Sequence, residues 1–279
     1  MSAMIAEEEL QFQVSEDYTK EDIKRVQKTL LEIGKAAAEI LEKNHIRHFI
    51  AYGTLLGAYR HKGFVPWDDD MDMFIVEDDY EKAMKCLEKE LPEWIVMQNQ
   101  KTDSKYSGSW TKLRDKYSQT EAWYYQGDNA FTYRGISFDL YVLHRASYNK
   151  VQVELLKENI RYYKTKYKCS GLLSFSEYMK KEVVLNSKLI VEKIKSFFVK
   201  RKEEVFWSVV PYKQKCFEKE WIFPLKKIKF EDYEFNAPNQ GELILNKIYG
   251  DYKKFPPLEK RRPGYSSVKF FKEECRNGK

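Results

Sequence analysis

The sequence predicts an α+β fold, in which a mixed sheet is flanked by helices and is followed by a largely helical, basic C-terminal part. Helix-like and strand-like segments alternate up to about residue 145, whereas helical periodicity dominates beyond that point. No internal repeat and no low-complexity linker divides the chain. We therefore expect one globule with two regions, in which residues 1–148 carry the sheet and residues 149–279 complete it.

Composition places the chain among folded globular proteins. Its 279 residues are 43% apolar and 15% aromatic, which is enough for a sizeable core. No run of about eighteen apolar residues predicts a membrane-spanning helix. The acidic start lacks the pattern of a secretory signal. The four cysteines are widely spaced and form no CxxC pair, so we expect reduced thiols and a cytoplasmic location.

The first helix is expected at Thr19–Lys43, because apolar residues recur there with the helical period of 3.6. Thr19 and Asp22 stand at the spacing of a capping box, which marks where the helix begins. A short strand at residues 47–52 and a second helix at residues 53–60 follow. Further along, we expect a strand at residues 70–76, a helix at 78–91, strands at 94–98 and 109–115, and a strand-rich segment at 131–143.

The second region is expected to be mostly helical between residues 150 and 206. Within it, Ile190, Ile194, Phe197 and Phe198 form an apolar stripe, which we expect to pack in the core. The rest of the region is expected to contain a hairpin at residues 225–235, a helix at 241–252 that ends near Gly250, and an irregular, basic last segment rich in proline.

Positive charge is concentrated in residues 157–229, where 19 lysines and arginines stand against 8 aspartates and glutamates, a net charge of +11. Such a segment is typical of proteins with an anionic partner, such as a membrane surface, a polyphosphate or a nucleic acid. The other interpretation is a solvated helical surface without a partner. The sequence leaves the two open.

The acidic block at residues 68–72 precedes an apolar strand. Asp70 and Asp72 are two positions apart and therefore point to the same face of that strand, while Met71 and Met73 point to the core. Two such carboxylates repel each other, and a hard divalent cation with a preference for oxygen ligands removes that repulsion. Asp139, a lone charge in a later apolar strand, can complete the site. The alternative is a solvated acidic turn, with Asp139 held in a salt bridge.

The residues before the acidic block have the chemistry of an anion site. Gly53 and Thr54 come directly after a strand and open a helix, where backbone N–H groups and a hydroxyl can hold a phosphate. Gly53 also permits close approach of a ligand. Arg60, His61 and Lys62 add cationic donors between this turn and the carboxylates. Together these features predict a nucleotidyltransferase-type site.

These motifs resemble those of a known family. The stretch GTLLGAYRHKGFVPWDDDMDMFI at residues 53–75 closely resembles the signature of the LicD family, which includes the fukutin-related proteins. Three later blocks resemble those of the family in the same order, namely KLRD at residues 112–115, ISFDLYVL at 136–143 and YGDYKKFPP at 249–257. The resemblance covers roughly residues 46–262 and is weakest in the middle.

The resemblance implies a nucleotidyltransferase fold that transfers a phospho-alcohol, most typically phosphocholine from CDP-choline, to a hydroxyl of a teichoic acid or lipopolysaccharide precursor with release of CMP. It further implies that Asp70, Asp72 and Asp139 hold Mg²⁺ or Mn²⁺ and that Asp68 is a base or an outer ligand. Gly53 and Thr54 would then contact the donor diphosphate. The expected partners are a CDP-activated donor and a lipid-linked glycan acceptor at the inner face of the membrane, with a peripheral membrane contact and no nucleic acid.

Further side chains are candidates for binding the donor. Lys62, Lys112 and Arg114 can balance phosphate charge, and the alternative for each is an ion pair at the surface. Asp69 is a second candidate, beside Asp68, for accepting the proton of the attacking hydroxyl. A choline group predicts an aromatic cage, and the aromatic residues available for it are Trp67, Trp110, Trp123, Tyr124, Tyr125 and Tyr141. Trp67 adjoins the acidic block and is the favoured member, although core packing is the alternative for any of these rings.

Two other kinds of function remain open from the sequence. The same site can transfer glycerol, ribitol or ethanolamine phosphate from a CDP-activated donor, or a nucleoside monophosphate from a nucleoside triphosphate. Alternatively, the basic helical region can make the chain a membrane- or nucleic-acid-binding protein with a vestigial site. The intact set of acids favours an enzyme.

Overall fold

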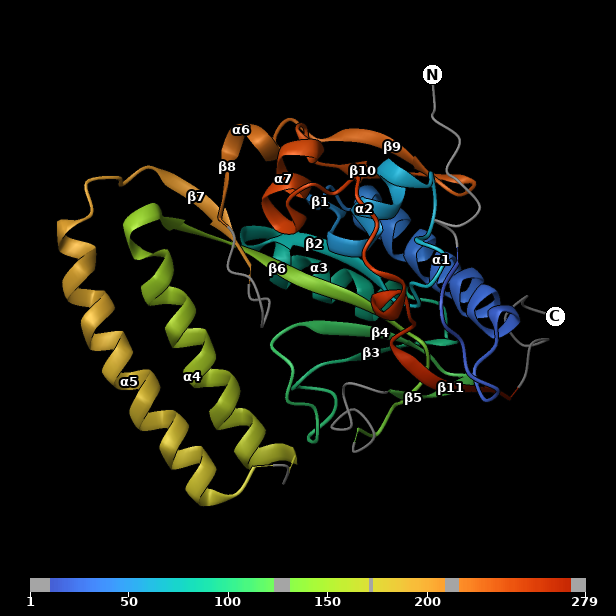
Figure 1. Ribbon diagram of the computed structural model, residues 1–279, viewed down its shortest axis with the longest axis horizontal. Coiled ribbons are helices and arrows are strands. Elements are labelled where there is room, and N and C mark those ends of the chain that lie inside the picture. Colours follow the sequence, from blue (N-terminus) through green and yellow to red (C-terminus); the bar gives the residue numbers. More distant parts are fainter. Residues whose placement is uncertain (1–10, 123–130, 171–172, 209–215, 272–279) are drawn as a thin grey trace.

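The computed structural model describes residues 11–122, 131–170, 173–208 and 216–271, and it confirms the α+β prediction (Figure 1). The helices are α1 (Lys20–Lys43), α2 (Tyr52–Arg60), α3 (Glu77–Glu90), α4 (Val151–Ser170), α5 (Phe175–Phe198), α6 (Lys219–Ile222) and α7 (Gly241–Tyr249). The strands are β1 (His48–Ile50), β2 (Met71–Val76), β3 (Ile95–Gln98), β4 (Thr111–Asp115), β5 (Ser118–Ala122), β6 (Ser137–Ser147), β7 (Glu204–Trp207), β8 (Cys216–Glu218), β9 (Lys226–Phe230), β10 (Tyr233–Ala237) and β11 (Tyr265–Phe270).

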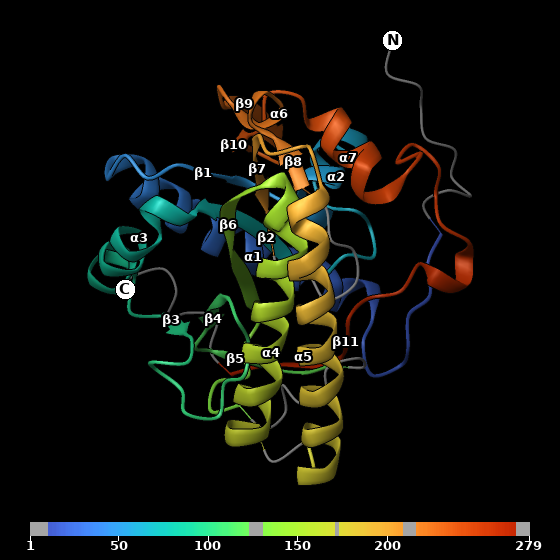
Figure 2. The ribbon, with the colours of Figure 1, turned by 90° about the vertical axis from the view of Figure 1, so that its left-hand side faces the viewer.

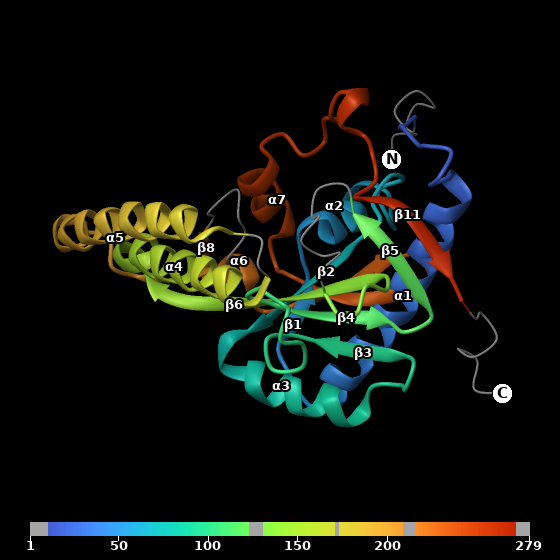
Figure 3. The ribbon, with the colours of Figure 1, turned by 90° about the horizontal axis from the view of Figure 1, so that it is seen from below.

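A seven-stranded mixed sheet lies between two helical layers. Its central path is β1-β2-β6-β4-β3, and β7 and β8 extend it from the far end of β6. The pair β2–β6 is parallel, whereas the other strand pairs of this path are antiparallel. Figure 3 shows α1 and α3 on one face of the sheet and α2 and α7 on the other.

The register of the central strands brings separate motifs together. Asp72 on β2 pairs with Asp139 on β6, and Asp139 pairs with Lys112 on β4. Met71 and Met73, which alternate with Asp72, are fully buried. Strand alternation therefore separates the core face from a polar face, as the sequence predicted.

Helix α1 forms where its apolar period and its cap predict. Thr19 is the N-cap, and its hydroxyl accepts a hydrogen bond from the Asp22 backbone N–H at 3.2 Å while the Asp22 carboxylate accepts from the Thr19 backbone at 3.0 Å. The buried face of the helix packs on the sheet at Gly34, where a Cβ would lie 3.0 Å from Phe138 and 3.1 Å from Met71. The small residue therefore lets the helix approach the sheet closely.

Helices α4 and α5 form a hairpin that projects from the globule (Figure 3). The prediction of a helical region up to residue 206 is wrong at its end, because residues 204–207 form β7 and pair with the last residues of β6. The prediction that the apolar stripe packs in the core is also wrong. No residue of α5 is buried, and the members of the stripe are 61% (Ile190), 56% (Ile194), 83% (Phe197) and 80% (Phe198) exposed.

The C-terminal part returns to the sheet side of the molecule. The predicted hairpin is present as β9–β10, and α7 ends at Gly250, whose φ of 78° suits glycine. The prediction of an irregular last segment is wrong for Tyr265–Phe270, which form β11 and pair with β5. Its partner lies more than 140 residues earlier in the chain, so no local pattern announces the strand. In the described part of the chain, no helix is long and apolar enough to cross a membrane.

We expect Gly57→Ala to destabilise the fold although alanine favours helices. A Cβ at Gly57 would lie 2.3 Å from the backbone oxygen of Gly63, so α2 and the following loop would have to separate. Overpacking of this kind costs about 1–3 kcal/mol. Urea denaturation measures the change, and Ser187→Ala on the exposed side of α5 should stay within about 0.5 kcal/mol of the parent protein. An unchanged urea midpoint for Gly57→Ala would contradict this expectation, because it would show that the loop moves away from α2 at little cost in stability.

Candidate active site

A pocket of about 690 Å³ lies between the start of α2, the acidic block and the segment that follows α7. Asp68, Asp70 and Asp72 line it together with Gly53. A Cβ at Gly53 would lie only 2.6 Å from a carboxylate oxygen of Asp68, so glycine lets this acid lie against the start of α2. The structure therefore brings the turn and the acids of the predicted site into one cavity.

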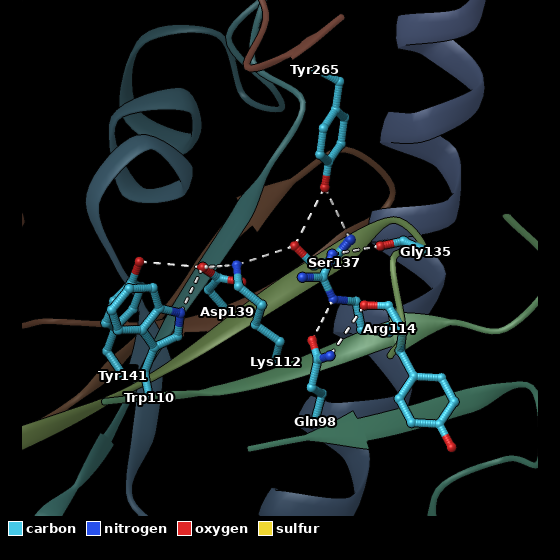
Figure 4. Close-up of polar contacts among 10 residues, drawn as sticks. Gln98, Trp110, Lys112, Arg114, Gly135, Ser137, Asp139, Tyr141 and Tyr265 are labelled. Atoms are coloured by element: carbon cyan, nitrogen blue, oxygen red, sulfur yellow. Dashed lines mark hydrogen bonds and ion pairs between the residues drawn. The ribbon is translucent and has the colours of Figure 1, made fainter. Parts of the chain in front are cut away.

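Asp139 lies beside the pocket in a polar row across three strands (Figure 4). Its carboxylate accepts from Lys112 Nζ at 2.8 Å to each oxygen and from the Trp110 indole at 3.0 Å. The Tyr141 hydroxyl donates to the same carboxylate at 3.3 Å. Asp139 and Lys112 are each 7% exposed, so their ion pair is shielded from water. Lys112 is thus directed at an acid of the site and forms a buried ion pair rather than a pair at the surface.

The carboxylates of the pocket raise one another's pKa. Burial raises the pKa of Asp68 and of Asp72 well above its usual range, and the charge of Asp70 adds to this effect in both cases. The pKa of Asp70 is also raised, first by loss of hydration and then by the charge of Asp139. The positive charge of Lys112 lowers the pKa of Asp70 and of Asp72, but it offsets only part of the increase. The protein itself therefore does not balance the negative charge that these acids have when they are ionised.

This donor set has the chemistry that a divalent cation requires. Carboxylate oxygens are the ligands that Mg²⁺ prefers, and a cation would relieve the repulsion among Asp68, Asp70 and Asp72. Within the described residues, no group of three or more histidine, cysteine or acidic side chains already has the geometry of a metal site. The ligand set Asp70, Asp72 and Asp139 thus stays a prediction that the donor chemistry fits.

Asp69 has a different role from its neighbours. It is 3% exposed, and its two oxygens accept backbone N–H bonds from Gly264 at 2.7 Å and from Tyr265 at 2.9 Å. It therefore fastens the acidic block to the start of β11. Gln27 on α1 holds the same loop by donating to the Asp68 carbonyl at 2.8 Å. These bonds fix the position of the pocket acids and occupy Asp69, the second candidate for the base.

Thr54 also positions the block. Its side chain is buried, and its hydroxyl accepts from the Asp72 backbone N–H at 2.8 Å, which ties the first turn of α2 to β2. The Gly53 backbone bonds to the Asp72 carboxylate and lowers the pKa of that acid. The predicted phosphate turn thus contacts the acids directly, with Gly53 in the pocket lining and Thr54 behind it.

The three residues of the predicted basic cluster, Arg60, His61 and Lys62, lie in different environments. Arg60 lines the pocket, and its guanidinium lies 4.3 Å from the ring centre of Phe255. His61 accepts a hydrogen bond from Arg60 Nε at 3.0 Å; burial, followed by the charge of Arg60, lowers its pKa to about 4, so it is neutral at physiological pH. Lys62 is exposed, has a φ of 62°, and is not part of the pocket lining.

Arg114 lies deeper than the pocket. Only 2% of it is exposed, and it donates to the Gln98 side chain and to the Gly135 carbonyl, each at 2.8 Å (Figure 4). Ser137 follows Gly135 by two residues, and its backbone N–H donates a hydrogen bond to the Tyr265 hydroxyl at 3.2 Å (Figure 4). Arg114 thus belongs to a buried hydrogen-bond network with Gln98 and Gly135, and it does not line the pocket.

The aromatic candidates separate in the same way. Trp67 lines the pocket but is only 8% exposed, and its ring lies 5.7 Å from the Arg261 guanidinium. Trp110 and Tyr141 stack at 5.2 Å beside Asp139. The other three candidates, Trp123, Tyr124 and Tyr125, lie outside the described residues.

The pocket contains residues that sequence reasoning did not select. Tyr52 and Tyr249 line the pocket together with the acids. Lys254 lines the same cavity, and so does Asp251, for which the sequence left open a functional role or a simple helix-ending turn at Gly250. The block YGDYKKFPP contains three of these four residues. Its resemblance to a family block could therefore have indicated that these residues belong to the site. Nothing in the sequence, however, predicts that the block packs against α2.

Adjacent strands that carry acids beside a pocket, on a mixed sheet, are the arrangement expected of a phosphotransferase of the nucleotidyltransferase type. Residues 45–158 match the family model described as LicD/FKTN/FKRP, nucleotidyltransferase domain. The resemblance to the LicD family is thereby confirmed, with the acidic block and Asp139 inside the matched segment.

Two relatives show how far the similarity extends. The chain is 26% identical over 243 residues to the lipopolysaccharide cholinephosphotransferase LicD of Haemophilus influenzae, which covers 80% of this chain and 88% of that protein. It is 32% identical over 110 residues to an uncharacterized protein of Rickettsia prowazekii, which covers 33% of this chain and 41% of that protein. The similarity to the first relative therefore extends well beyond residues 45–158, the segment that the family model matches.

We expect Lys112→Met to destabilise the protein strongly and Asp139→Asn to compensate for it. Removing one partner of a buried ion pair costs about 3–5 kcal/mol, because the other charge stays buried without its counter-charge. The double variant buries a neutral pair and should regain most of that loss. Urea denaturation of the parent, the two single variants and the double variant in the presence of a chelator measures the coupling. Additive single effects would contradict this role of Lys112.

Proposed function

We propose that the protein transfers phosphocholine from CDP-choline to a hydroxyl of a lipopolysaccharide precursor and releases CMP. The observation that carries the proposal is the row Asp72–Asp139–Lys112, which lies in register beside a pocket that holds two more acids. The similarity to a lipopolysaccharide cholinephosphotransferase over most of both chains supports the choice of substrate. We further propose that the protein works at the inner face of the membrane, where a lipid-linked acceptor is available.

The donor diphosphate is assigned to the pocket at the start of α2. The N-terminus of this helix favours an anion, and Arg60 and Lys254 line the same cavity. Asp70, Asp72 and Asp139 would hold Mg²⁺ or Mn²⁺, which neutralises diphosphate charge when bound. Positioning and charge neutralisation are the main requirements of phosphoryl transfer.

The acceptor hydroxyl attacks the phosphorus that carries choline. A P–O bond to the acceptor forms, the P–O bond to CMP breaks, and the hydroxyl proton passes to a base. Asp68 is the proposed base, because it lines the pocket and its raised pKa makes it a better proton acceptor near neutral pH than an ordinary aspartate. Asp69 is less suited, since backbone N–H groups occupy both of its oxygens.

The choline group is assigned to the two tyrosines that face the acids. A quaternary ammonium binds to the faces of aromatic rings. The rings of Trp67 and Phe255 already lie next to arginine guanidinium groups. Tyr249 is 41% exposed and adjoins the carboxylates, so its ring is available to the donor, and Tyr52, which packs on Phe74 and Tyr141, lines the same cavity.

The acceptor is assigned to a second cleft of about 400 Å³ between α3, the β3–β4 connection and α4. Trp110 forms part of its wall and contacts Asp139, so this cleft reaches the edge of the acid row. Tyr162 on α4 and the amide side chains of Asn99 and Gln100 also line it. Aromatic rings combined with hydrogen-bonding amides suit a sugar, and two clefts beside one acid row suit a two-substrate transfer.

We expect the protein to release CMP from CDP-choline in the presence of Mg²⁺ and a lipopolysaccharide acceptor. Asp72→Asn should lower the rate by about 100-fold or more, because charge stabilisation in the transition state is lost. Asp232→Asn removes an acid of a surface ion pair with Lys35 and should leave the rate unchanged. Parallel arms with CDP-ethanolamine, CDP-glycerol, CDP-ribitol, a teichoic acid acceptor and nucleoside triphosphates identify the substrates. Release of pyrophosphate in place of CMP would reject the proposal.

We also expect Mg²⁺ to raise the midpoint of thermal unfolding. A ligand that binds only the folded state at 100 times its Kd adds about 2.7 kcal/mol, and each kcal/mol is worth roughly 2–4 °C in a protein of this size. The variant Asp70→Asn/Asp72→Asn should unfold at a higher temperature than the parent in the presence of a chelator, because the repulsion is relieved, and should no longer respond to Mg²⁺. An equal response of parent and variant would place the cation elsewhere.

A further inference from the structure

Helix α5 carries an apolar surface that the protein itself does not cover. Nine of the fifteen exposed large hydrophobic residues in the described part of the chain belong to this one helix. The most exposed are Phe197 at 83%, Phe198 at 80% and Phe175 at 64%. Monomeric proteins rarely expose a contiguous patch of this kind without a partner for it.

The patch forms a single face of the helix. At 100° per residue, Met179, Val183, Ile190, Ile194 and Phe197 fall within a sector of about 60°. The residues that contact α4 lie on the opposite side, as the stacking of Tyr178 on Tyr167 at 4.7 Å shows. Figure 1 shows α5 on the outer side of the hairpin, with α4 between it and the sheet, and Figure 2 shows the two helices side by side. The apolar face is therefore directed away from the rest of the protein.

Positive charge borders this face. Lys181, Lys188 and Lys195 are seven residues apart and form a row along one side of the helix, between the apolar face and α4. All three are exposed. Two acids of the helix, Glu182 and Glu192, are half-buried, and Glu192 pairs with Lys195 at 2.7 Å, so the row of three lysines keeps a net positive charge. An apolar face with a cationic border is the arrangement of helices that lie in the surface of a membrane.

We propose that α5 docks on the surface of an anionic phospholipid bilayer, with its apolar face inserted among the acyl chains and its lysine row at the headgroups. Charge complementarity favours this occupant over a second copy of the chain, because an antiparallel two-fold pairing through the same face would place the two lysine rows on the same side of the interface. The inference deepens the proposed function, since it gives the enzyme a defined orientation toward a lipid-linked acceptor, but the contact itself requires no turnover.

Vesicle flotation of the full chain tests the proposal without any substrate. The protein should float with vesicles that contain phosphatidylglycerol, should not float with pure phosphatidylcholine vesicles, and should bind less as salt increases. Phe197→Ser/Phe198→Ser and, separately, Lys181→Gln/Lys188→Gln/Lys195→Gln should each reduce binding at least tenfold. Leu243→Ser, at a 41% exposed apolar site on α7, is the matched control and should bind like the parent protein.

Two results would overturn the docking proposal. One is equal flotation of the parent and both α5 variants. The other is a parent dimer in sedimentation that does not float and that Phe197→Ser/Phe198→Ser converts to monomers, since the face would then belong to a second copy. CMP release with a soluble acceptor fragment separates this proposal from the proposed function, because the α5 variants should retain it. A protein that floats but releases no CMP would leave the docking surface in place and reject the reaction.

Discussion

The pairing of β2, β6 and β4 determines where the chemistry of this protein lies. Their register places Asp72, Asp139 and Lys112 side by side, although 67 positions separate the two acids in the chain. A shift of one residue in any of these strands would turn its side chain toward α1 and α3 and into the core. The buried side chains that alternate with the row, such as Met71 and Leu140, resist such a shift because they would have to leave the core. Hydrophobic packing on one face of the sheet thus maintains the charge arrangement on the other.

Keeping several carboxylates together has a cost, and the surrounding structure offsets part of it. Burial and mutual repulsion disfavour the charged forms of Asp68 and Asp72. The acidic block nevertheless keeps its conformation, because Asp69 bonds to two backbone N–H groups and Thr54 bonds to the backbone of β2. The elements that hold the block are distinct from the acids that face the pocket. A site with uncompensated charge on a rigid frame is ready to bind a cation and an anionic donor, at the expense of stability in their absence.

Much of this arrangement could be predicted from the sequence, because it rests on local patterns. The capping box of α1, the alternation in β2 and the turn at Gly53 each follow from residues that are close in the chain. Other features depend on partners that are distant in the chain. The strand β11 exists through β5, and Arg114 is a buried structural residue because Gln98 and the Gly135 carbonyl receive its hydrogen bonds. The role of Tyr249 likewise depends on how the segment after α7 packs against α2, which no short-range pattern records.

Helix α5 shows most clearly what periodicity leaves undetermined. An apolar stripe with the helical period indicates that one face of the helix avoids water, but it does not indicate which surface covers that face. In this protein α4 takes the opposite side and the stripe stays exposed. The hairpin grows directly from the end of β6, through a single turn at Tyr148–Lys150, and the same strand carries Asp139 near its start. A surface to which α5 binds would therefore be held in a fixed relation to the acid row, and the second cleft, with α4 as one wall, lies along the path between them.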